Sequence, residues 1–323
     1  MAAGIRIVPY RPALAGDWDA FVAASNNGTV FHRQAFLGYH RGSLADGFRH
    51  LLFYRGEKLA AVLPLGTAGD GEARSPWGAS FGGPVTADSA YAHQAGLVEA
   101  LLAHARAEGL RRLLITPAPW PYHRHADASL EFCLLRAGFR LENRDLCNVI
   151  DLSLLGAGDP PDTFSYACDK QIRKARREGL TARASDDLET FHAILVENRR
   201  KHGTRPTHDL EDLRRLRAAL GPDLALFAAY RGGTMEAGVL CFAANARVAL
   251  NFYSAHREES AASGANNLAN WQTMAWARER GFRYYDFGTS SLRMDPNDGL
   301  IRFKESFGPG GALRDTFRWE DGG

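Results

Sequence analysis

Two distant passages of the chain, residues 94–119 and 266–291, show the same order of hydrophobic and polar positions. Each begins with apolar residues at i, i+3, i+4 and i+7, which predicts an amphipathic helix. Each helical pattern ends at a basic, acidic and glycine break, because glycine accepts the backbone angle that follows a helix. A run of large apolar residues comes next and predicts a strand. The same helix–strand unit therefore occurs twice.

A hairpin signal precedes each unit, at residues 51–65 and 224–242. Both signals place a Tyr-Arg-Gly turn between apolar runs, which is typical of antiparallel strands. The separation between matched landmarks is nearly constant, so we interpret the chain as an internal repeat. Residues 156–162 are rich in glycine and proline and predict a linker. We therefore expect an α/β protein with mixed sheets and two domains, 1–155 and 156–323.

Composition and charge leave most function classes open. The chain has 323 residues with 45% hydrophobic and 24% charged positions, and its formal net charge is +2. These values are typical of a globular protein, and they provide no general attraction for anions. Four cysteines without a Cys-x-x-Cys pair favour buried thiols over disulfides or a metal site. No secretory signal or spanning helix is evident, so we expect a cytoplasmic protein.

Several short segments resemble the Fem family of peptidoglycan bridge-forming aminoacyltransferases and their CelD-like relatives, which contain tandem GNAT acyltransferase folds. Each segment alone is short, and their order along the chain is the more specific feature. The usual GNAT pyrophosphate motif is missing. The similar segments are TVFHRQAFL (29–37), the LPL…SPW…GGP stretch (63–85), the basic DKQIRKARREGL (169–180), YYDFGTSS (284–291) and RFKESFG (302–308).

The resemblance implies acyl or aminoacyl transfer to an amine, and it predicts Asp286 and Lys304 as the catalytic residues. Acyl transfer needs a group that takes the proton of the amine. Asp286 precedes Gly288 in a predicted strand and could do this, or could instead cap the following turn. The resemblance implies that Lys304 meets an anionic part of a substrate. Glu305 is a weaker candidate, because an ordinary charge pair on the surface of a helix could also explain Lys304 and Glu305.

Further substrate-binding candidates come from both halves. Asn251 and Tyr253 lie in an alternating apolar segment that predicts a strand, where polar side chains either bind substrate or face solvent. Trp77 belongs to an aromatic, glycine-rich loop that could line a pocket, and His32 stands between Phe31 and Arg33. A lone histidine beside aromatic residues is more often structural than catalytic. The remaining candidates, Tyr285 and Ser290, belong to the YYDFGTSS segment.

Four cations, Lys170, Arg173, Lys174 and Arg177, share one face of a predicted helix. Such a face could bind phosphate groups, although a solvated face is the commoner explanation. Asn266 and Asn267 precede a helix expected from residue 268. An asparagine there caps the helix, and a helix N-terminus also binds phosphate. These six residues are the candidates for binding the acyl donor or tRNA.

We therefore expect an acyltransferase with no tightly bound cofactor and no metal, whose co-substrate is acyl-CoA or aminoacyl-tRNA. A cell-envelope or polysaccharide precursor with an amine is the expected acceptor. One alternative is a non-catalytic protein of the same fold that binds a polysaccharide or lipid-linked precursor. Another is a nucleic-acid binder. The sequence leaves open peripheral membrane contact and whether the protein is a monomer or a homodimer.

Overall fold

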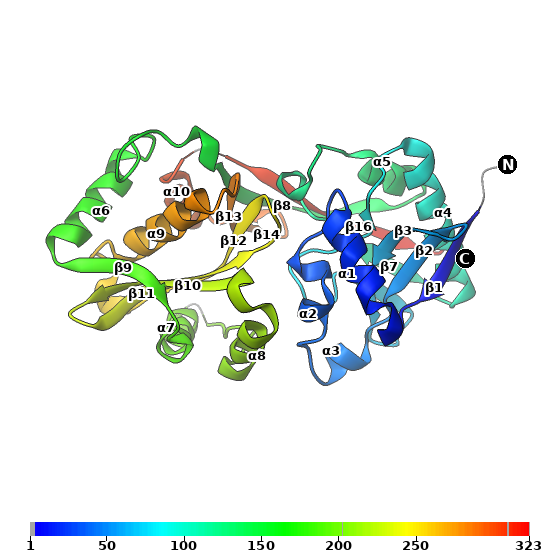
Figure 1. The fold of residues 1–323 in the computed structure, drawn as a ribbon, viewed down its shortest axis with the longest axis horizontal. Coiled ribbons are helices and arrows are strands. Elements are labelled where there is room, and N and C mark those ends of the chain that lie inside the picture. Colours follow the sequence, from blue (N-terminus) through cyan, green and yellow to red (C-terminus); the bar gives the residue numbers. More distant parts are fainter. Residues whose placement is uncertain (1–3, 202, 309, 323) are drawn as a thin grey trace. The chain divides into compact units, whose positions relative to one another are not determined.

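The computed structural model describes residues 4–201, 203–308 and 310–322, and the chain forms two compact units (Figure 1). The first unit contains residues 1–146, 293–295 and 312–323, and the second contains 147–292 and 296–311. The division falls at residues 146/147, whereas the sequence analysis placed it at 155/156. The difference arises because a long strand, β8, begins in the first unit and ends in the second.

The first unit contains α1 to α5 and most of the early strands. Its strands are β1 (Ile5–Pro9), β2 (Leu51–Arg55), β3 (Lys58–Leu63), β4 (Gly66–Thr67), β5 (Glu72–Ser75), β6 (Val85–Thr86), β7 (Arg112–Ile115), the first part of β8 (Arg140–Asp151), and β16 (Ala312–Glu320). Its helices are α1 (Ala15–Ala24), α2 (Gln34–Leu37), α3 (Ser43–Asp46), α4 (Tyr91–Ala107) and α5 (Ser129–Arg136).

The second unit contains the later elements. Its helices are α6 (Tyr166–Arg177), α7 (Leu188–Lys201), α8 (Leu210–Leu220), α9 (Ala265–Glu279) and α10 (Asp298–Glu305). Its strands are the end of β8, β9 (Leu180–Ser185), β10 (Leu224–Arg231), β11 (Thr234–Ala243), β12 (Val248–His256) and β13 (Tyr284–Thr289). The short strands β14 (Ser291–Leu292) and β15 (Asp295–Pro296) pair with each other.

In the first unit, α4 covers strands from two sheets. Strands pair in the orders β1-β2-β3-β6 and β4-β5-β7-β16. Leu97, Leu101 and Ala105 of α4 are buried at helical spacing and join one apolar cluster with residues of β2, β3 and β7. The helix ends before Gly109, whose φ of 69° only glycine adopts easily. The predicted helix and its glycine stop are therefore confirmed.

In the second unit, the strand order is β8-β13-β12-β11-β10-β9. Figure 1 shows α6 and α9 on one side of these strands and α7 and α8 on the other. Leu268, Met274 and Ala277 of α9 pack with α6 residues in one buried cluster. The predicted hairpin at residue 230 is present, since β10 and β11 pair antiparallel. The α/β class with mixed sheets is confirmed, because β12 and β13 are parallel while their neighbours are antiparallel.

The strand that closes each half of the sequence reaches the other unit. The end of β8 lies in the second unit, and β16 lies in the first unit. β8 follows the first half, and its residues Cys147–Asp151 pair antiparallel with β13. β16 follows the second half and pairs antiparallel with β7, with Phe317 opposite Ile115. The repeat predicted both strands but could not predict this exchange, because apolar alternation identifies a strand without identifying its neighbour.

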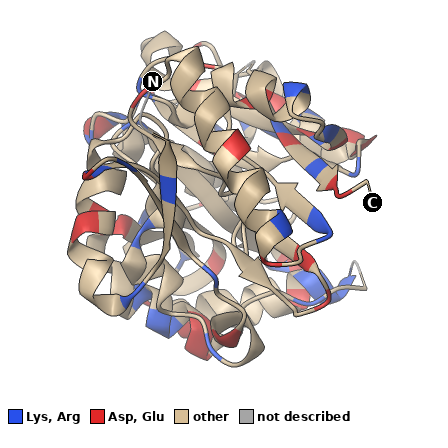
Figure 2. Cartoon of the chain, turned by 90° about the vertical axis from the view of Figure 1, so that its right-hand side faces the viewer, with Lys and Arg blue, Asp and Glu red and all other residues tan. Residues whose placement is uncertain are grey.

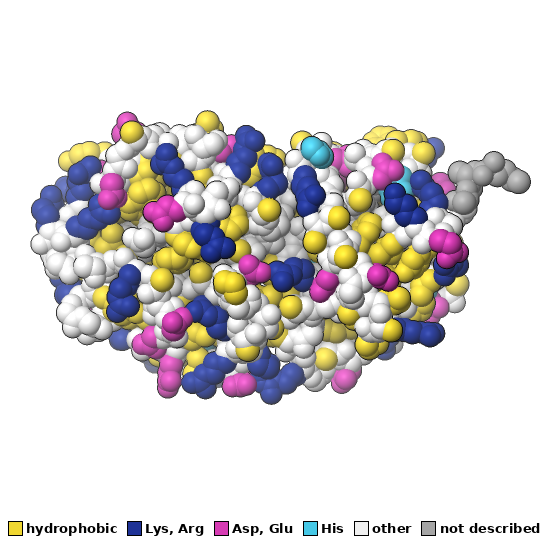
Figure 3. Space-filling view, viewed as in Figure 1, with side chains coloured by type: hydrophobic (Ala, Val, Ile, Leu, Met, Phe, Trp, Pro, Cys, Tyr) yellow, Lys and Arg dark blue, Asp and Glu magenta, His cyan; other side chains and the backbone are white. Residues whose placement is uncertain are grey.

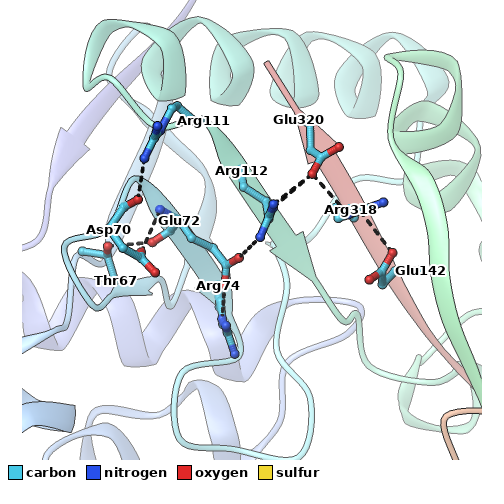
Figure 4. Close-up of polar contacts among 9 residues, drawn as sticks. All are labelled: Thr67, Asp70, Glu72, Arg74, Arg111, Arg112, Glu142, Arg318 and Glu320. Carbon is cyan, nitrogen blue, oxygen red and sulfur yellow. Dashed lines mark hydrogen bonds and ion pairs between the residues drawn. The ribbon is translucent and has the colours of Figure 1, made fainter. Parts of the chain in front are cut away.

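Ion pairs connect the strands around β16 in the first unit (Figure 4). Arg112 of β7 contacts Glu72 of β5 at 3.0 Å and Glu320 of β16 at 3.1 Å. Arg318 of β16 contacts Glu142 of β8 at 3.1 Å. Basic and acidic residues are intermixed on this side of the molecule (Figure 2). Because such pairs are exposed, burial of Phe317 and Trp319 contributes more to holding β16 in place.

Candidate functional site

The candidate site lies where two parallel strands of the second unit separate. β12 and β13 pair only from Val248 to Leu250 on one strand and from Tyr284 to Asp286 on the other. Beyond this point β12 continues beside β11 to His256, while Thr289 at the end of β13 pairs with β8. Ligands of open α/β sheets bind at the carboxyl ends of diverging strands.

A bulge in β12 changes which side chains face each side of that strand. The pairing between β11 and β12 shifts so that Leu240 lies opposite Tyr253 and Cys241 lies opposite Asn251. One residue, Phe252, is left as the extra residue between them. Bulges redirect side chains and recur beside active sites. The predicted residues Asn251 and Tyr253 therefore both lie at the separation of the strands.

Two predicted residues, Asn251 and Tyr285, converge on Asn270 of the helix α9. Asn251 donates a hydrogen bond to Asn270 Oδ1 at 2.8 Å, and the Tyr285 hydroxyl lies 3.5 Å from the same oxygen. Ser254 donates to Asn266 Oδ1 at 2.8 Å. Asn270 is fully buried, and the sequence analysis missed it. Its signal was a polar residue on the apolar face of a helix. This network connects β12 and β13 to the first turns of α9.

Tyr253 is held by a histidine that the sequence analysis also missed. Its hydroxyl lies 2.9 Å from Nδ1 of His208, which belongs to the segment between α7 and α8. Burial raises the pKa of the Tyr253 phenol, so the hydroxyl remains protonated near neutral pH. A protonated phenol in this position can donate a proton to a leaving group.

Asp286 and Lys304 are both buried and both bond to the backbone at the end of β13. The Asp286 carboxylate accepts a hydrogen bond from the Gly288 amide at 2.7 Å, which is the capping geometry considered as the alternative. The Lys304 ammonium donates to the carbonyls of Gly288 at 2.9 Å and Thr289 at 2.7 Å. Ser290 donates to Asn148, and Glu305 is exposed. Catalytic roles for Asp286 and Lys304 remain predictions.

Three of the predicted donor-binding residues, Asn266, Asn267 and Lys174, lie at or beside the start of α9. This helix begins at Ala265, earlier than expected, so Asn266 and Asn267 lie in its first turn and Gly264 is the N-cap. Lys174 of α6 donates to the carbonyl of Ala262 at 2.8 Å, in the segment that enters α9. Basic side chains are visible over α6 at the left of Figure 3. Lys170 and Arg177 are exposed, and Arg173 pairs with Asp169 at 2.8 Å.

Trp77 and His32 belong to the first unit and are held by first-unit partners. The Trp77 indole donates to the Leu44 carbonyl at 2.8 Å. His32 is fully buried, and its Nδ1 accepts a hydrogen bond from the Thr29 amide at 3.1 Å. The histidine therefore closes a local turn. This is the structural role that a histidine beside aromatic residues most often has. Its proposed role in substrate binding remains a prediction.

His32 predicts acid sensitivity of the first unit. Burial lowers the pKa of His32 from its ordinary value of 6.5 to about 4. Between pH 6.5 and 4, the His32 side chain is protonated in the unfolded chain and neutral in the folded protein. Folding stability therefore falls as the pH drops from 6.5 toward 4. The expected loss is about 3 kcal/mol. Urea unfolding at several pH values measures it, and His32→Gln should flatten the dependence. An equally steep dependence in His32→Gln would exclude this cause.

Three further features concern the described part of the chain: metal sites, disulfides and membrane-spanning helices. No cluster of three His, Cys, Asp or Glu side chains there is placed to hold a metal ion. The four cysteines are buried free thiols. No helix among the described residues is long and apolar enough to cross a membrane.

Comparison with known proteins identifies the second unit. Residues 164–304 match the family model of a GNAT acetyltransferase domain. The chain has the tandem GNAT fold. No match is found among curated proteins. The crystal structure of FemX has a TM-score of 0.70 and 16% identity, over 98% of this chain and 97% of FemX. The structure of L-PGS from Bacillus licheniformis has a TM-score of 0.63 and 12% identity, over 97% and 92% of the two chains.

A third similar structure has the same tandem arrangement. It is a tandem GNAT protein from the clavulanic acid biosynthesis pathway, with a TM-score of 0.55, 14% identity and coverage of 99% of both chains. At such identities the structures establish the tandem fold alone. The family match adds that residues 164–304 match an acetyltransferase domain. GNAT domains use acyl-CoA as their co-substrate. The matched residues include the separation of β12 and β13, α6 and the start of α9.

Proposed function

We propose that this tandem GNAT protein transfers an acyl or aminoacyl group from a phosphate-bearing donor to an amine, in its second unit. The observation that carries the proposal is the junction of three features inside the matched domain. These are the separated strands β12 and β13, the glycine-capped start of α9, and the cations of α6 beside it. A helix start with adjacent cations suits a phosphate, and the separated strands suit an extended chain.

The reaction exchanges one acyl bond for another. The amine nitrogen attacks the acyl carbonyl, a C–N bond forms, and the bond to the thiol or ribose oxygen of the donor breaks. The amine loses a proton, and the leaving group gains one. We assign proton donation to Tyr253, because its phenol stays protonated and His208 fixes its orientation. Asp286 remains our proposed partner of the amine, and Lys304 our proposed residue for the anionic substrate group.

Turnover assays test the reaction and the donor together. Purified protein is incubated with labelled acyl-CoA or aminoacyl-tRNA and a panel of amines, including amine-bearing cell-envelope and polysaccharide precursors. Tyr253→Phe should lower kcat about a hundredfold, because general acid catalysis contributes that much. Tyr91→Phe, a partly exposed tyrosine of the first unit, is the matched control. Asp286→Asn keeps an oxygen for the Gly288 amide and removes the charge. Full turnover in Tyr253→Phe and Asp286→Asn would refute the residue assignments.

The α6 cations predict a selective effect on the donor. Lys170→Gln with Arg177→Gln should raise KM for the donor about tenfold and leave kcat nearly unchanged, because the charges bind phosphate without touching the acyl group. Rising salt should weaken donor binding less in the double variant than in the natural protein. Arg278→Gln, an exposed arginine near the far end of α9, should change neither quantity. An equal effect of Arg278→Gln would indicate only a general influence of net charge.

A non-catalytic protein of the same fold is the second candidate. The observation in its favour is that Asp286 and Lys304 both bond to the protein backbone. In that case the second unit would bind a polysaccharide or lipid-linked precursor without converting it. Saturable donor or precursor binding with no turnover for any donor–amine pair would favour this candidate.

A further inference from the structure

A cavity of about 710 Å³ lies within the first unit, and none of its lining residues is used in the proposed reaction. Its walls come from the end of β1, the start of β2, α2, β4, β5 and the last turn of α4. This volume is in the range of small-molecule sites, which combine apolar walls with a few polar groups. Apolar wall residues include Leu37, Phe48, Leu51, Leu65, Ala73 and Leu110.

His50 provides a buried hydrogen-bond donor on the cavity wall. Its Nδ1 accepts from the Leu65 amide at 3.2 Å, so the proton of the neutral ring is on Nε2. Burial lowers the pKa of His50 to about 4, which keeps the ring neutral. Among the described residues, no hydrogen-bond partner is recorded for its Nε2. Rings of Phe48, Trp18 and Tyr10 pack around the imidazole and hold it in place.

Two further donors line the same cavity. The Gln34 side chain makes no recorded hydrogen bond within the described part of the chain, and its Nε2 is buried. Arg49 is exposed and donates to the carbonyls of Asp46 and Phe48, at 2.9 and 2.7 Å. No carboxylate is recorded as its partner among the described residues. Three groups on this wall, the His50 Nε2, the Gln34 amide nitrogen and the Arg49 guanidinium, can therefore donate to a ligand, and one of them is a cation.

We propose that this cavity is a binding site for a small apolar carboxylate, such as a free acyl chain. The chain would displace water from the apolar walls, and the carboxylate would accept from His50 and the Gln34 amide beside the Arg49 charge. An unpartnered buried donor is costly, so a ligand that accepts from it gains that free energy on binding. Glu108 lies exposed on the same wall, and its negative charge would repel a second anionic group on the ligand.

Calorimetric titration with three ligands of equal chain length tests the head group. Decanoate should bind saturably, and decanol about tenfold more weakly because it lacks the charge. Decylamine should bind no better than decanol. Equal affinity for decanoate and decanol, tighter binding of decylamine, or no saturable binding of any of the three would overturn the proposal.

Variants locate the site. Arg49→Gln and Gln34→Leu should each weaken decanoate binding about tenfold, as expected for a lost hydrogen bond to a charged group. Gln34→Leu should leave thermal stability unchanged or raise it, since the amide has no recorded protein partner. Arg140→Gln, an exposed first-unit arginine outside the cavity, is the matched control. Unchanged affinity in both variants would overturn the assignment. Because binding is measured directly, this result is independent of acyl transfer.

Discussion

Gly264→Ala should destabilise the second unit by about 3–4 kcal/mol, from the combined cost of a strained backbone and overpacking. Gly264 has a φ of 78°, in the left-handed region that favours glycine. A Cβ there would lie 2.3 Å from the Gln171 carbonyl oxygen of α6 and 3.3 Å from the Ala175 Cβ. Since a backbone oxygen cannot move alone, α6 or the start of α9 must shift. Donor KM should rise as well, because the shift separates the α6 cations from α9.

Gly281→Ala is the matched control for this prediction. Gly281 follows α9 with a φ of 80°, and a Cβ there would meet no atom within 4 Å. It carries the backbone strain without the clash, so it should cost only about 1 kcal/mol. Chemical denaturation of both variants measures the difference. Equal losses in the two variants would show that α6 yields easily, and that the close approach at Gly264 is not a constraint on the site.

The sequence predicted the elements of this site better than their contacts. Periodicity located the helix that became α9 and the strand that became β13, because burial of one face imposes a repeat of 3.6 or 2 residues. It missed Asn270 and His208, since a single polar residue carries no period. The bulge at Phe252 was equally hidden, although it decides where Asn251 and Tyr253 point. Residues that act through a specific partner become visible only when the partner is placed.

The same limit explains the two views of the first half. The first half lacks counterparts of Asp286 and Lys304 at the matching positions of the repeat, so the repeat alone predicts a scaffold there. The cavity beside His50 arises from six elements that are distant in sequence, so no local motif announces it. His50 stands alone just before β2, and no local sequence pattern marks it. A repeat therefore predicts a common framework, whereas each unit acquires its own ligand chemistry from the side chains that meet inside it.

Lys304→Met should destabilise the second unit by about 4 kcal/mol, although the two side chains are similar in size. Lys304 is only 4% exposed, and its ammonium donates to the carbonyls of Gly288 and Thr289 at the end of β13. Methionine leaves both oxygens without these bonds, and each unsatisfied buried group costs about 1–3 kcal/mol. Chemical denaturation measures the loss. The end of β13 should also loosen, so kcat should fall in the folded variant at low temperature.

Lys174→Met separates this effect from the general loss of a lysine. Lys174 also donates to a backbone carbonyl, at 2.8 Å, but its side chain is 39% exposed. Water can replace its bond, so the variant should lose less than about 1 kcal/mol. If the substrate contact that we propose for Lys304 outweighs its bonds to β13, Lys304→Met would keep its stability and raise the donor KM. That pattern would contradict a structural role for Lys304 and support the role that the family resemblance implies.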